Sequence, residues 1–366
     1  MFVTICIISL FLNSAFLIYL LMGFRHNVVC RMAGGIPSVS ILVAVRDGAR
    51  TIGSCLESLL DQDYPHDRFE IIVIDDCSTD DTPRIIYNIA TKNRFVKYFR
   101  NEQPRKWRST KKAALSAGVE IATGEILLFT DADCFPPKTW VTNVVLQFGS
   151  RTGLIAGFSP QCAGDKKMWN DFLLIDSLAG AVVAAGSIGW GTGITCTGRN
   201  LACRKVTLRD IGGYDAFPDT VSGDDDFLLQ LVSRKGAWEV KYSFHHATHV
   251  PAAGPADLFE FIKQKRRHIS AGRSYRPPHM IGYSLYHLSN VLIWLFALVG
   301  FWLGPFYLLP LSIKLLIDGY VLKQMADELD ISCNTGAFFI WELLLPIYHI
   351  IAGPCALFGK INWNSR

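Results

Sequence analysis

An uncharged apolar stretch at the N-terminus limits the folds open to this chain more than any other feature. No charged side chain occurs in residues 2–22, FVTICIISLFLNSAFLIYLLM. In a helix, about 20 apolar residues cross the roughly 30 Å hydrocarbon core of a bilayer. The alternative is a cleaved signal peptide, but the stretch lacks the basic first segment and small-residue cleavage site of such peptides. The sequence therefore predicts a retained transmembrane anchor over residues 1–24.

Basic residues follow this anchor on its C-terminal side. They are Arg25, His26 and Arg31. An excess of Lys and Arg marks the cytoplasmic end of a membrane span. We therefore expect an integral membrane protein, in the cell inner membrane if the protein is bacterial, with the following domain in the cytoplasm.

The C-terminal third of the chain is also apolar. Three apolar runs occur there, at residues 283–303, 304–322 and 337–358. They predict a membrane region over residues 280–360 with two or three helices. Because polar side chains are costly in lipid, we expect His287 and Asn290 to face protein. The side of the C-terminus stays open, since four spans would place it outside whereas Lys360 and Arg366 favour the inside.

Bulk composition excludes other classes of protein. The 366 residues carry a formal net charge of +4, which indicates no strongly basic face for nucleic acid. The ten cysteines are scattered without paired metal-type spacing, so they predict reduced thiols rather than a disulfide framework. One local basic cluster, residues 263–268 (KQKRRH), is either a juxtamembrane patch for anionic lipid or part of a binding site.

Short apolar strands alternate with helical patterns between residues 36 and 275. Strands are predicted at 39–45, 71–74, 95–99 and 126–130, and helices at 50–62, 81–92 and 110–122. Because these strands are apolar along their whole length, the alternation predicts an α/β domain with a parallel sheet covered on both faces. Ligands of such sheets bind beyond the carboxyl ends of the strands. Two acidic clusters lie there, Asp75–Asp76 and the pair Asp131 and Asp133, and they give the first indication of function.

The segment EILLFTDADC, residues 125–134, ends an apolar strand in two carboxylates. Residues two apart in an extended segment project to the same side, so Asp131 and Asp133 are expected to converge. Two such carboxylates repel each other unless a proton or a cation lies between them. Mg²⁺ is commonly held by one or two carboxylates together with substrate phosphates. The pair therefore predicts a site for Mg²⁺ or Mn²⁺ and a diphosphate, and the alternative is a solvated loop.

Five segments, in order, resemble the family 2-like inverting glycosyltransferases with a GT-A fold. They are VIDDCSTDDT, TKKAALSAGVEIATGEILLFTDADC, GTGITCTGRNLACRKVTLRDIGGYD, SGDDDFLLQLVSRKGAW and FIKQKRRHISAG. The last is similar to the Gln-x-x-Arg-Trp motif of membrane-embedded synthases that make cellulose, hyaluronan or glucosylceramide. The resemblance implies a cytoplasmic GT-A domain with a Rossmann-like mixed sheet over residues 36–275, flanked by transmembrane helices.

The resemblance also implies a donor site. Asp75 and Asp76 match the acids that contact the nucleotide, and Lys111 matches a lysine near the donor. Asp131 and Asp133 match the motif that binds the metal and the diphosphate. The implied donor is a nucleotide sugar, a UDP- or GDP-sugar.

The last two motifs imply the catalytic residues. Asp224 and Asp225 match the acidic doublet, with Asp225 in the position of the general base. Asp226 is an extra acid, so the register leaves open whether Asp225 or Asp226 is the base. Gln264 and Arg267 match the last motif, near the diphosphate and the acceptor. The implied reaction is a metal-assisted single displacement that inverts the anomeric carbon and transfers a hexose to a lipid or glycan acceptor.

The chain departs from the family pattern in places, and other functions compete. His268 replaces the usual tryptophan, which puts stacking against an acceptor sugar in doubt; Asp47–Gly48 replaces Asn-Glu, and Ala44 replaces a proline. A processive polysaccharide synthase usually carries more spans. A non-catalytic nucleotide-sugar-binding subunit of a polysaccharide synthesis or export complex would be expected to lack an acidic motif. Intact motifs and few spans favour transfer to a lipid or short glycan in the membrane.

Overall fold

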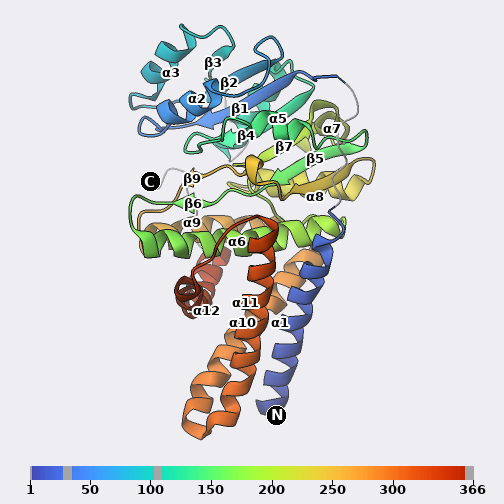
Figure 1. The fold of residues 1–366 in the computed structure, drawn as a ribbon, viewed down its shortest axis with the longest axis vertical. Helices are drawn as coiled ribbons and strands as arrows, with labels where there is room; N and C mark the ends of the chain where they lie inside the picture. The colour runs from blue at the N-terminus through green and yellow to red at the C-terminus, as the bar shows by residue number, and fades with distance from the viewer. Residues whose placement is uncertain (1, 28–34, 103–108, 359–366) are drawn as a thin grey trace.

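The computed structural model describes residues 2–27, 35–102 and 109–358 of the chain. An α/β domain lies at one end, and helices extend from it on one side (Figure 1). The basic residue Arg31, with Lys360 and Arg366 at the C-terminus, lies outside the described residues. The same holds for the last two residues of the predicted membrane region 280–360.

Seven strands form the central sheet, in the order β3-β2-β1-β4-β7-β5-β8. They are β1 Val39–Val45, β2 Phe69–Asp75, β3 Val96–Arg100, β4 Ile126–Asp131, β5 Thr152–Gly157, β7 Leu201–Arg204 and β8 Glu239–Ser243. β7 runs antiparallel to β4 and β5, and the other pairs are parallel, so the sheet is mixed. The register pairs Val45 with Asp75 and Ala44 with Asp131, so the two acidic clusters end level at one edge of the sheet.

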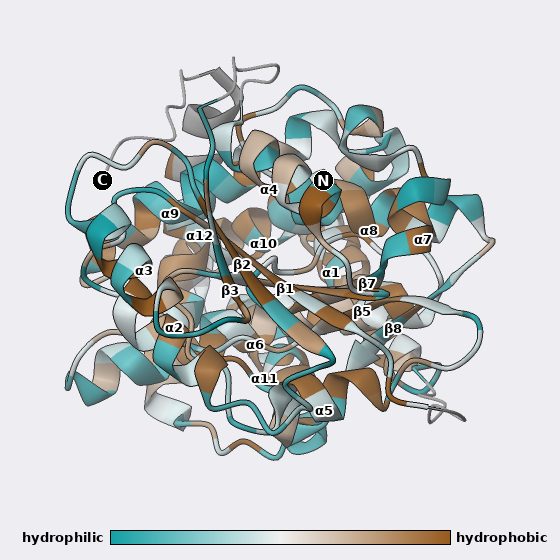
Figure 2. Cartoon of the chain, turned by 90° about the horizontal axis from the view of Figure 1, so that it is seen from above, coloured by the Kyte–Doolittle hydropathy of each residue, from teal (hydrophilic) through white to brown (hydrophobic). Residues whose placement is uncertain are grey.

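Helices cover both faces of this sheet. One face packs against α2 Ile52–Leu60, α3 Thr82–Ala90 and α5 Trp140–Val145; the other packs against α4 Thr110–Ile121, α6 Lys167–Gly189 and α8 Asp224–Lys235. Successive strand residues point to opposite faces, so Ile41 and Val43 join the first core and Leu42 joins the second. Burial of each such side chain stabilises the fold by about 1.5–3 kcal/mol. Figure 2 shows hydrophobic colour on the central strands between the helices.

Shorter elements complete the domain. They are the small parallel pair β6 Gln161–Cys162 and β9 Ala252–Ala253, the helices α7 Lys205–Asp210 and α9 Leu258–Ala271, and 3-10 turns at Gly213–Ala216, His246–Thr248 and Gly272–Ser274. The last turn leads from α9 directly toward the first helix of the C-terminal region.

Three helices extend away from the domain side by side (Figure 1): α1 Phe2–Phe24, α10 Pro277–Leu303 and α11 Leu309–Glu328, with a 3-10 turn at Pro305–Leu308. In the described part of the chain, three helices are long and apolar enough to cross a membrane, at Val3–Phe24, Lys167–Gly189 and Pro277–Trp302. The first and third were predicted, whereas the second was not. The predicted run 304–322 starts in the 3-10 turn and continues as α11, which carries charged residues along its length and is not one of the three.

α6 lies across the base of the domain, between the sheet and the extended helices (Figure 1). Its most apolar segment is 67% buried inside the chain, so its apolar surface is largely used in packing. Its Gly186 meets α1 near Gly23, and a side chain at either glycine would collide with the backbone of the other helix. Small residues permit such close crossing. The indole of Trp190 also donates a hydrogen bond to the Tyr19 carbonyl at 2.7 Å, which further fixes α1 to α6.

α12 Thr335–Phe358 packs against α6, α9 and α10 instead of extending with the other helices (Figure 1). Lys314 of α11 forms ion pairs with Asp318, at 2.6 Å, and with Glu342 of α12, and all three side chains are buried. Since an unpaired buried charge is costly, this network ties α12 to α11. As predicted, Asn290 is buried against protein, and His287 packs against a histidine of α12.

Candidate active site

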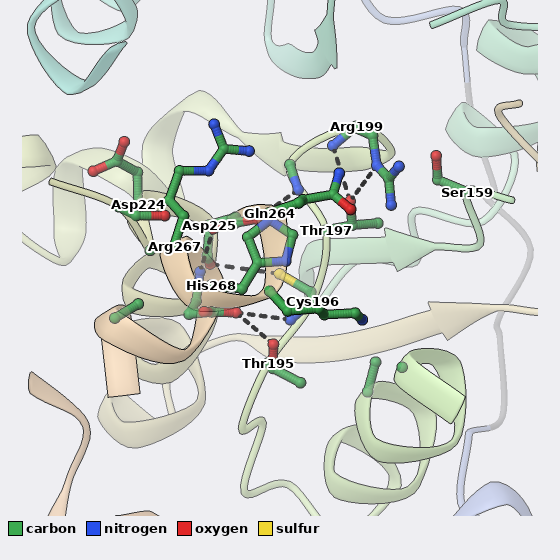
Figure 3. Close-up of a pocket in the computed structure, with 18 of the residues that line it drawn as sticks. Ser159, Thr195, Cys196, Thr197, Arg199, Asp224, Asp225, Gln264, Arg267 and His268 are labelled. Atoms are coloured by element: carbon green, nitrogen blue, oxygen red, sulfur yellow. Dashed lines mark hydrogen bonds between the residues drawn. The ribbon is translucent and has the colours of Figure 1, made fainter. Parts of the chain in front are cut away.

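A cavity of about 950 Å³ opens at the carboxyl ends of β1 and β4. Its walls include the loop of residues 195–199, the first turn of α8 and one side of α9 (Figure 3). It then continues between α6, α10 and α12. The predicted site residues that line it are Asp76, Lys111, Asp131, Asp133, Asp224, Asp225, Gln264 and Arg267. The fold thus gathers residues that are far apart in the sequence around one space.

The two acids after β2 have different surroundings. Asp75 is fully buried and accepts hydrogen bonds from the Ser78 amide at 2.8 Å and the Tyr98 hydroxyl at 3.1 Å. Asp76 lines the cavity, where its Oδ2 lies 3.7 Å from the Arg46 guanidinium. Consecutive residues at a strand end project to opposite sides. Asp75 therefore holds the turn after the strand, and Asp76 is available for the predicted contact to a nucleotide.

Asp131 and Asp133 reach the cavity together from the end of β4. Lys111 of α4 donates a hydrogen bond to the Asp131 carboxylate. Burial opposes ionisation of Asp131, but the positive charges of Lys111, Arg199 and Arg267 outweigh it and hold the pKa of this carboxyl below its usual range. Asp131 is therefore a carboxylate at neutral pH, as a metal ligand must be.

The chemistry of this donor set fits a hard divalent cation. Carboxylate oxygens are the ligands that Mg²⁺ prefers, and the ion usually completes its shell with water and substrate phosphates. Among the described residues, no group of three or more His, Cys, Asp or Glu side chains is arranged to hold an ion by itself. Asp131 and Asp133 would therefore hold a metal jointly with the phosphates of a ligand.

Three acids occupy the first turn of α8, which starts after Gly223 at a left-handed φ of 98°. Asp225 is partly exposed to the cavity, and its Oδ2 accepts a hydrogen bond from the Gly198 amide at 2.7 Å. Asp224 is buried, and its Oδ1 has no hydrogen-bond partner. Burial raises the pKa of Asp224 to about 7. The positive charge of Lys111 acts against this rise, and the negative charge of Asp225 adds to it. The positive end of the helix dipole favours negative charge at this turn.

Asp226 is engaged within the protein. Its carboxylate accepts hydrogen bonds from the Thr195 hydroxyl at 2.7 Å, the Cys196 amide at 3.0 Å and the Tyr275 hydroxyl. Burial and the neighbouring charge of Asp225 raise the pKa of Asp226 to about 8. Asp226 therefore fixes the 195–199 loop, and this arrangement favours Asp225 over Asp226 as the acid that meets a substrate.

α9 presents Gln264, Arg267 and His268 to the cavity (Figure 3), because residues three and four apart share one side of a helix. His268 is open to the cavity yet lies deep within the protein. Burial, together with the charges of Arg267 and Lys265, lowers the pKa of its imidazole well below the usual range. His268 is thus neutral at pH 7. Lys265, in turn, forms an ion pair with Asp176 of α6 at 2.5 Å.

Two functional features escaped the sequence analysis. Arg199 borders the cavity and helps to keep Asp131 ionised, while its Nε donates a hydrogen bond to the Thr197 hydroxyl at 3.1 Å (Figure 3). The other is the anchoring of Asp226 by Thr195 and Tyr275. The segment GTGITCTGRN begins the third of the five segments that carry the resemblance, and its single arginine was the available signal.

Comparison of the sequence with known protein families identifies the family of the domain. Residues 40–205 match the family described as Glycosyl transferase family 2. These residues form a glycosyl transferase family 2 domain. The match includes Asp76, Lys111, Asp131 and Asp133, whereas the acids of α8 and the residues of α9 lie beyond it.

Curated relatives of the family 2 domain extend further along the chain. Probable glycosyltransferase YdaM of Bacillus subtilis (strain 168) is 28% identical over 265 residues, which are 68% of this chain and 60% of that protein. Beta-monoglucosyldiacylglycerol synthase of Nostoc sp. is 26% identical over 245 residues, which are 65% of this chain and 50% of that protein. The chain thus spans only part of the length of these relatives.

A solved structure shares the whole architecture. The mannosyltransferase PcManGT from Pyrobaculum calidifontis, solved in complex with GDP-Man and Mn²⁺, has a TM-score of 0.64 and 19% identity to this chain. The likeness covers 99% of this chain and 100% of that chain. It therefore confirms the predicted GT-A fold, and it extends to the apolar helices around the family 2 domain.

Proposed function

We propose that this protein is a membrane-bound inverting glycosyltransferase that moves a hexose from a nucleotide sugar to a hydroxyl group of a lipid or glycan. One observation carries the proposal. A single cavity on a family 2 domain contains the paired acids of β4, the acids of α8 and the Arg267 region of α9. The domain is proposed to face the cytoplasm, since Arg25 and His26 follow the first apolar helix.

The donor site is proposed at the sheet edge. Asp76 would contact the nucleoside, and Lys111 and Arg267 would bind the diphosphate, for which guanidinium geometry is well suited. Asp131 and Asp133 would hold Mg²⁺ or Mn²⁺, which neutralises charge on the departing diphosphate when bound. The structural relative PcManGT was solved with GDP-Man and Mn²⁺. A UDP- or GDP-sugar is therefore the proposed donor.

Asp225 is proposed as the general base. It would take the proton from the acceptor hydroxyl as that oxygen attacks the anomeric carbon and the bond to the diphosphate breaks. Such a base typically contributes about 10²–10⁴-fold to the rate. One displacement inverts the anomeric centre. Asp224 is the second candidate, because its Oδ1 has no hydrogen-bond partner and its pKa of about 7 suits a base at neutral pH.

A lipid or a glycan remains the proposed acceptor class. The relative from Nostoc sp. is named as a synthase of beta-monoglucosyldiacylglycerol, a lipid. Another relative, from Staphylococcus epidermidis, is named as a poly-beta-1,6-N-acetyl-D-glucosamine synthase and is 27% identical over 211 residues. A processive synthase is therefore the competing enzyme, and His268 in place of tryptophan favours transfer to a lipid.

A donor screen tests the proposal. Membranes containing the wild-type protein or Asp225→Asn would be given each common nucleotide sugar with Mg²⁺ or Mn²⁺. We expect wild-type protein to release a nucleoside diphosphate from one of them and to form a product that mass spectrometry identifies. The variant should release at least about 100-fold less. If no donor is turned over, the non-catalytic nucleotide-sugar-binding subunit becomes the better explanation.

A further inference from the structure

The cavity does not end at the catalytic acids. Past Arg267 and His268 it continues between α6, α10 and α12, which lie on the side of the domain from which the apolar helices extend (Figure 1). Small and apolar side chains line much of this passage, among them Ala179, Ala181, Val183, Leu288 and Leu345. Leu288 lines the cavity and is also 56% exposed, so the passage borders the apolar flank of α10. Lipid chains fit such a wall.

Aromatic rings follow the passage from the acids to the membrane helices. Tyr275, which is bonded to Asp226, has its ring 6.3 Å from the ring of Tyr283. Tyr283 stacks on His287 at 5.7 Å, and His287 lies 4.0 Å from His349 of α12. These rings combine apolar faces with polar edges. The passage is therefore built for a molecule that has both an apolar and a polar part.

Two imidazoles in this passage each have one ring nitrogen without a hydrogen-bond partner. The Nδ1 atoms of His287 and His349 are buried and unpaired, and the His349 side chain is 8% exposed. Buried polar atoms in proteins almost always have a partner, and polar groups among membrane helices usually mark functional positions. Both side chains line the cavity, so rotation of either ring about its Cβ–Cγ bond would turn the unpaired nitrogen toward a molecule inside the cavity. A hydroxyl group suits an imidazole because it both donates and accepts.

The charges in the cavity indicate which headgroup fits. Among the described lining residues of α6, α10 and α12, Asp176 is the one acidic or basic side chain apart from the histidines, and Lys265 neutralises it at 2.5 Å. The other cations of the cavity, which are Arg46, Lys111, Arg199 and Arg267, line its donor end. A phosphate headgroup in the passage would have no dedicated cation beside it, whereas an uncharged headgroup needs none.

We infer that this passage is the acceptor site and that it takes an uncharged lipid whose headgroup carries free hydroxyl groups. The inference rests on the proposed transfer reaction. His287 and His349 hold one headgroup hydroxyl, while another reaches Asp225. There the acceptor oxygen bonds to the anomeric carbon, its proton goes to Asp225, and the nucleoside diphosphate leaves. The chains of the lipid extend past Leu288 toward the apolar flank of α10.

The test replaces each histidine with phenylalanine, which keeps a ring but removes both nitrogens. Wild type, His287→Phe and His349→Phe would be assayed in nanodiscs. The acceptors would be monoglucosyldioleoylglycerol, an uncharged lipid with several headgroup hydroxyl groups, and undecaprenyl phosphate. We expect each substitution to raise the KM for monoglucosyldioleoylglycerol about tenfold, since each removes a hydrogen bond to the headgroup. The KM for the nucleotide sugar should stay unchanged. His279→Phe, on the same helix but away from the lining of the cavity, is the matched control.

The outcomes separate this inference from the proposed function. If wild-type protein turns over no nucleotide sugar, the proposed function fails. If it transfers sugar to undecaprenyl phosphate but not to monoglucosyldioleoylglycerol, or if both histidine variants keep the wild-type acceptor KM, the acceptor site is wrong. A photoreactive monoglucosyldiacylglycerol with a diazirine in one acyl chain, used on wild-type protein, avoids dependence on the folding of variants. Labelled peptides should come from α10 and α12 near the passage, and labelling confined to α1 would overturn the inference.

Discussion

Replacement of Asp226 by asparagine distinguishes the role of Asp226 from that of Asp225, since the sequence left both acids open as the general base. The Asp226 carboxyl is buried, accepts hydrogen bonds from Thr195, Cys196 and Tyr275, and has a pKa of about 8. It is therefore mostly uncharged at pH 7, and an asparagine amide matches it in shape and supplies an oxygen to the same donors. We expect Asp226→Asn to keep the transfer rate within about threefold, because at most one hydrogen bond changes. Asp225→Asn should lower the rate about 10²–10⁴-fold.

The same substitution predicts a change in how stability depends on pH. Unfolded Asp has a pKa of about 3.9, so between there and pH 8 the folded chain retains a proton that the unfolded chain has lost. Stability therefore falls as pH rises, by about 1.4 kcal/mol for each pH unit well below pH 8 and less steeply near pH 8. The loss between pH 6 and pH 8 is about 2 kcal/mol. Asp226→Asn removes this loss of stability with rising pH, while Asp224 contributes the same pH dependence to the wild type and the variant.

Thermal unfolding followed by tryptophan fluorescence in detergent, from pH 5.5 to 9, measures the difference. The Tm of Asp226→Asn should exceed that of wild type by a margin that grows from pH 6 to pH 8 and then levels off. Parallel Tm curves would refute the account of Asp226 as a buried neutral acid. Loss of transfer in Asp226→Asn with retention in Asp225→Asn would show that the two roles are reversed.

Three further substitutions, one of them with a control variant, test other parts of the structure. Asp133→Ala should weaken binding of the nucleoside diphosphate about tenfold or more in Mn²⁺ but not in EDTA. Calorimetry measures this binding, and equal affinities of the variant and the wild type in Mn²⁺ would show that Asp133 does not hold the metal. Asp224→Asn should abolish a rise in transfer rate centred near pH 7, where Asp224 loses its proton. If Asp224→Asn is inactive while Asp225→Asn is active, Asp224 is the general base. Lys314→Met should cost about 3–5 kcal/mol of stability because it leaves buried carboxylates unpaired. The control Lys323→Met breaks an exposed ion pair on the same helix and should cost about 1 kcal/mol of stability or less. Chemical denaturation measures both losses of stability, and equal losses in the two variants would contradict the importance of the buried network.

Local patterns in the sequence were enough to predict the sheet edge that carries the acids. The apolar strand before Asp131 and the residue spacing of Asp131 and Asp133 both follow from local geometry, and the structure places the pair in the cavity. Asp75 and Asp76 were harder to separate, because their roles depend on which side of the strand faces the ligand. That choice depends on Ser78 and Tyr98, which close over Asp75.

Long-range packing explains what the sequence could not provide. α6 is apolar over most of its length because it is enclosed between the sheet and the extended apolar helices, and its sequence has no amphipathic period to mark it. The pairing of Lys265 with Asp176 and of Tyr275 with Asp226 joins residues that meet only once the chain has folded. The antiparallel course of β7 likewise depends on the connections around it rather than on its own residues.

The crossing of α1 and α6 at Gly23 and Gly186 fixes the position of the cavity relative to the first apolar helix. α6 is both a wall of the cavity and the support for α1, so in the proposed membrane enzyme the reacting centre would stay at a constant height relative to that helix. A catalytic domain on a loose tether would sample many heights and would seldom meet a headgroup at the right depth. With the height fixed, an acceptor that diffuses in the plane of the bilayer would need to search in two dimensions only.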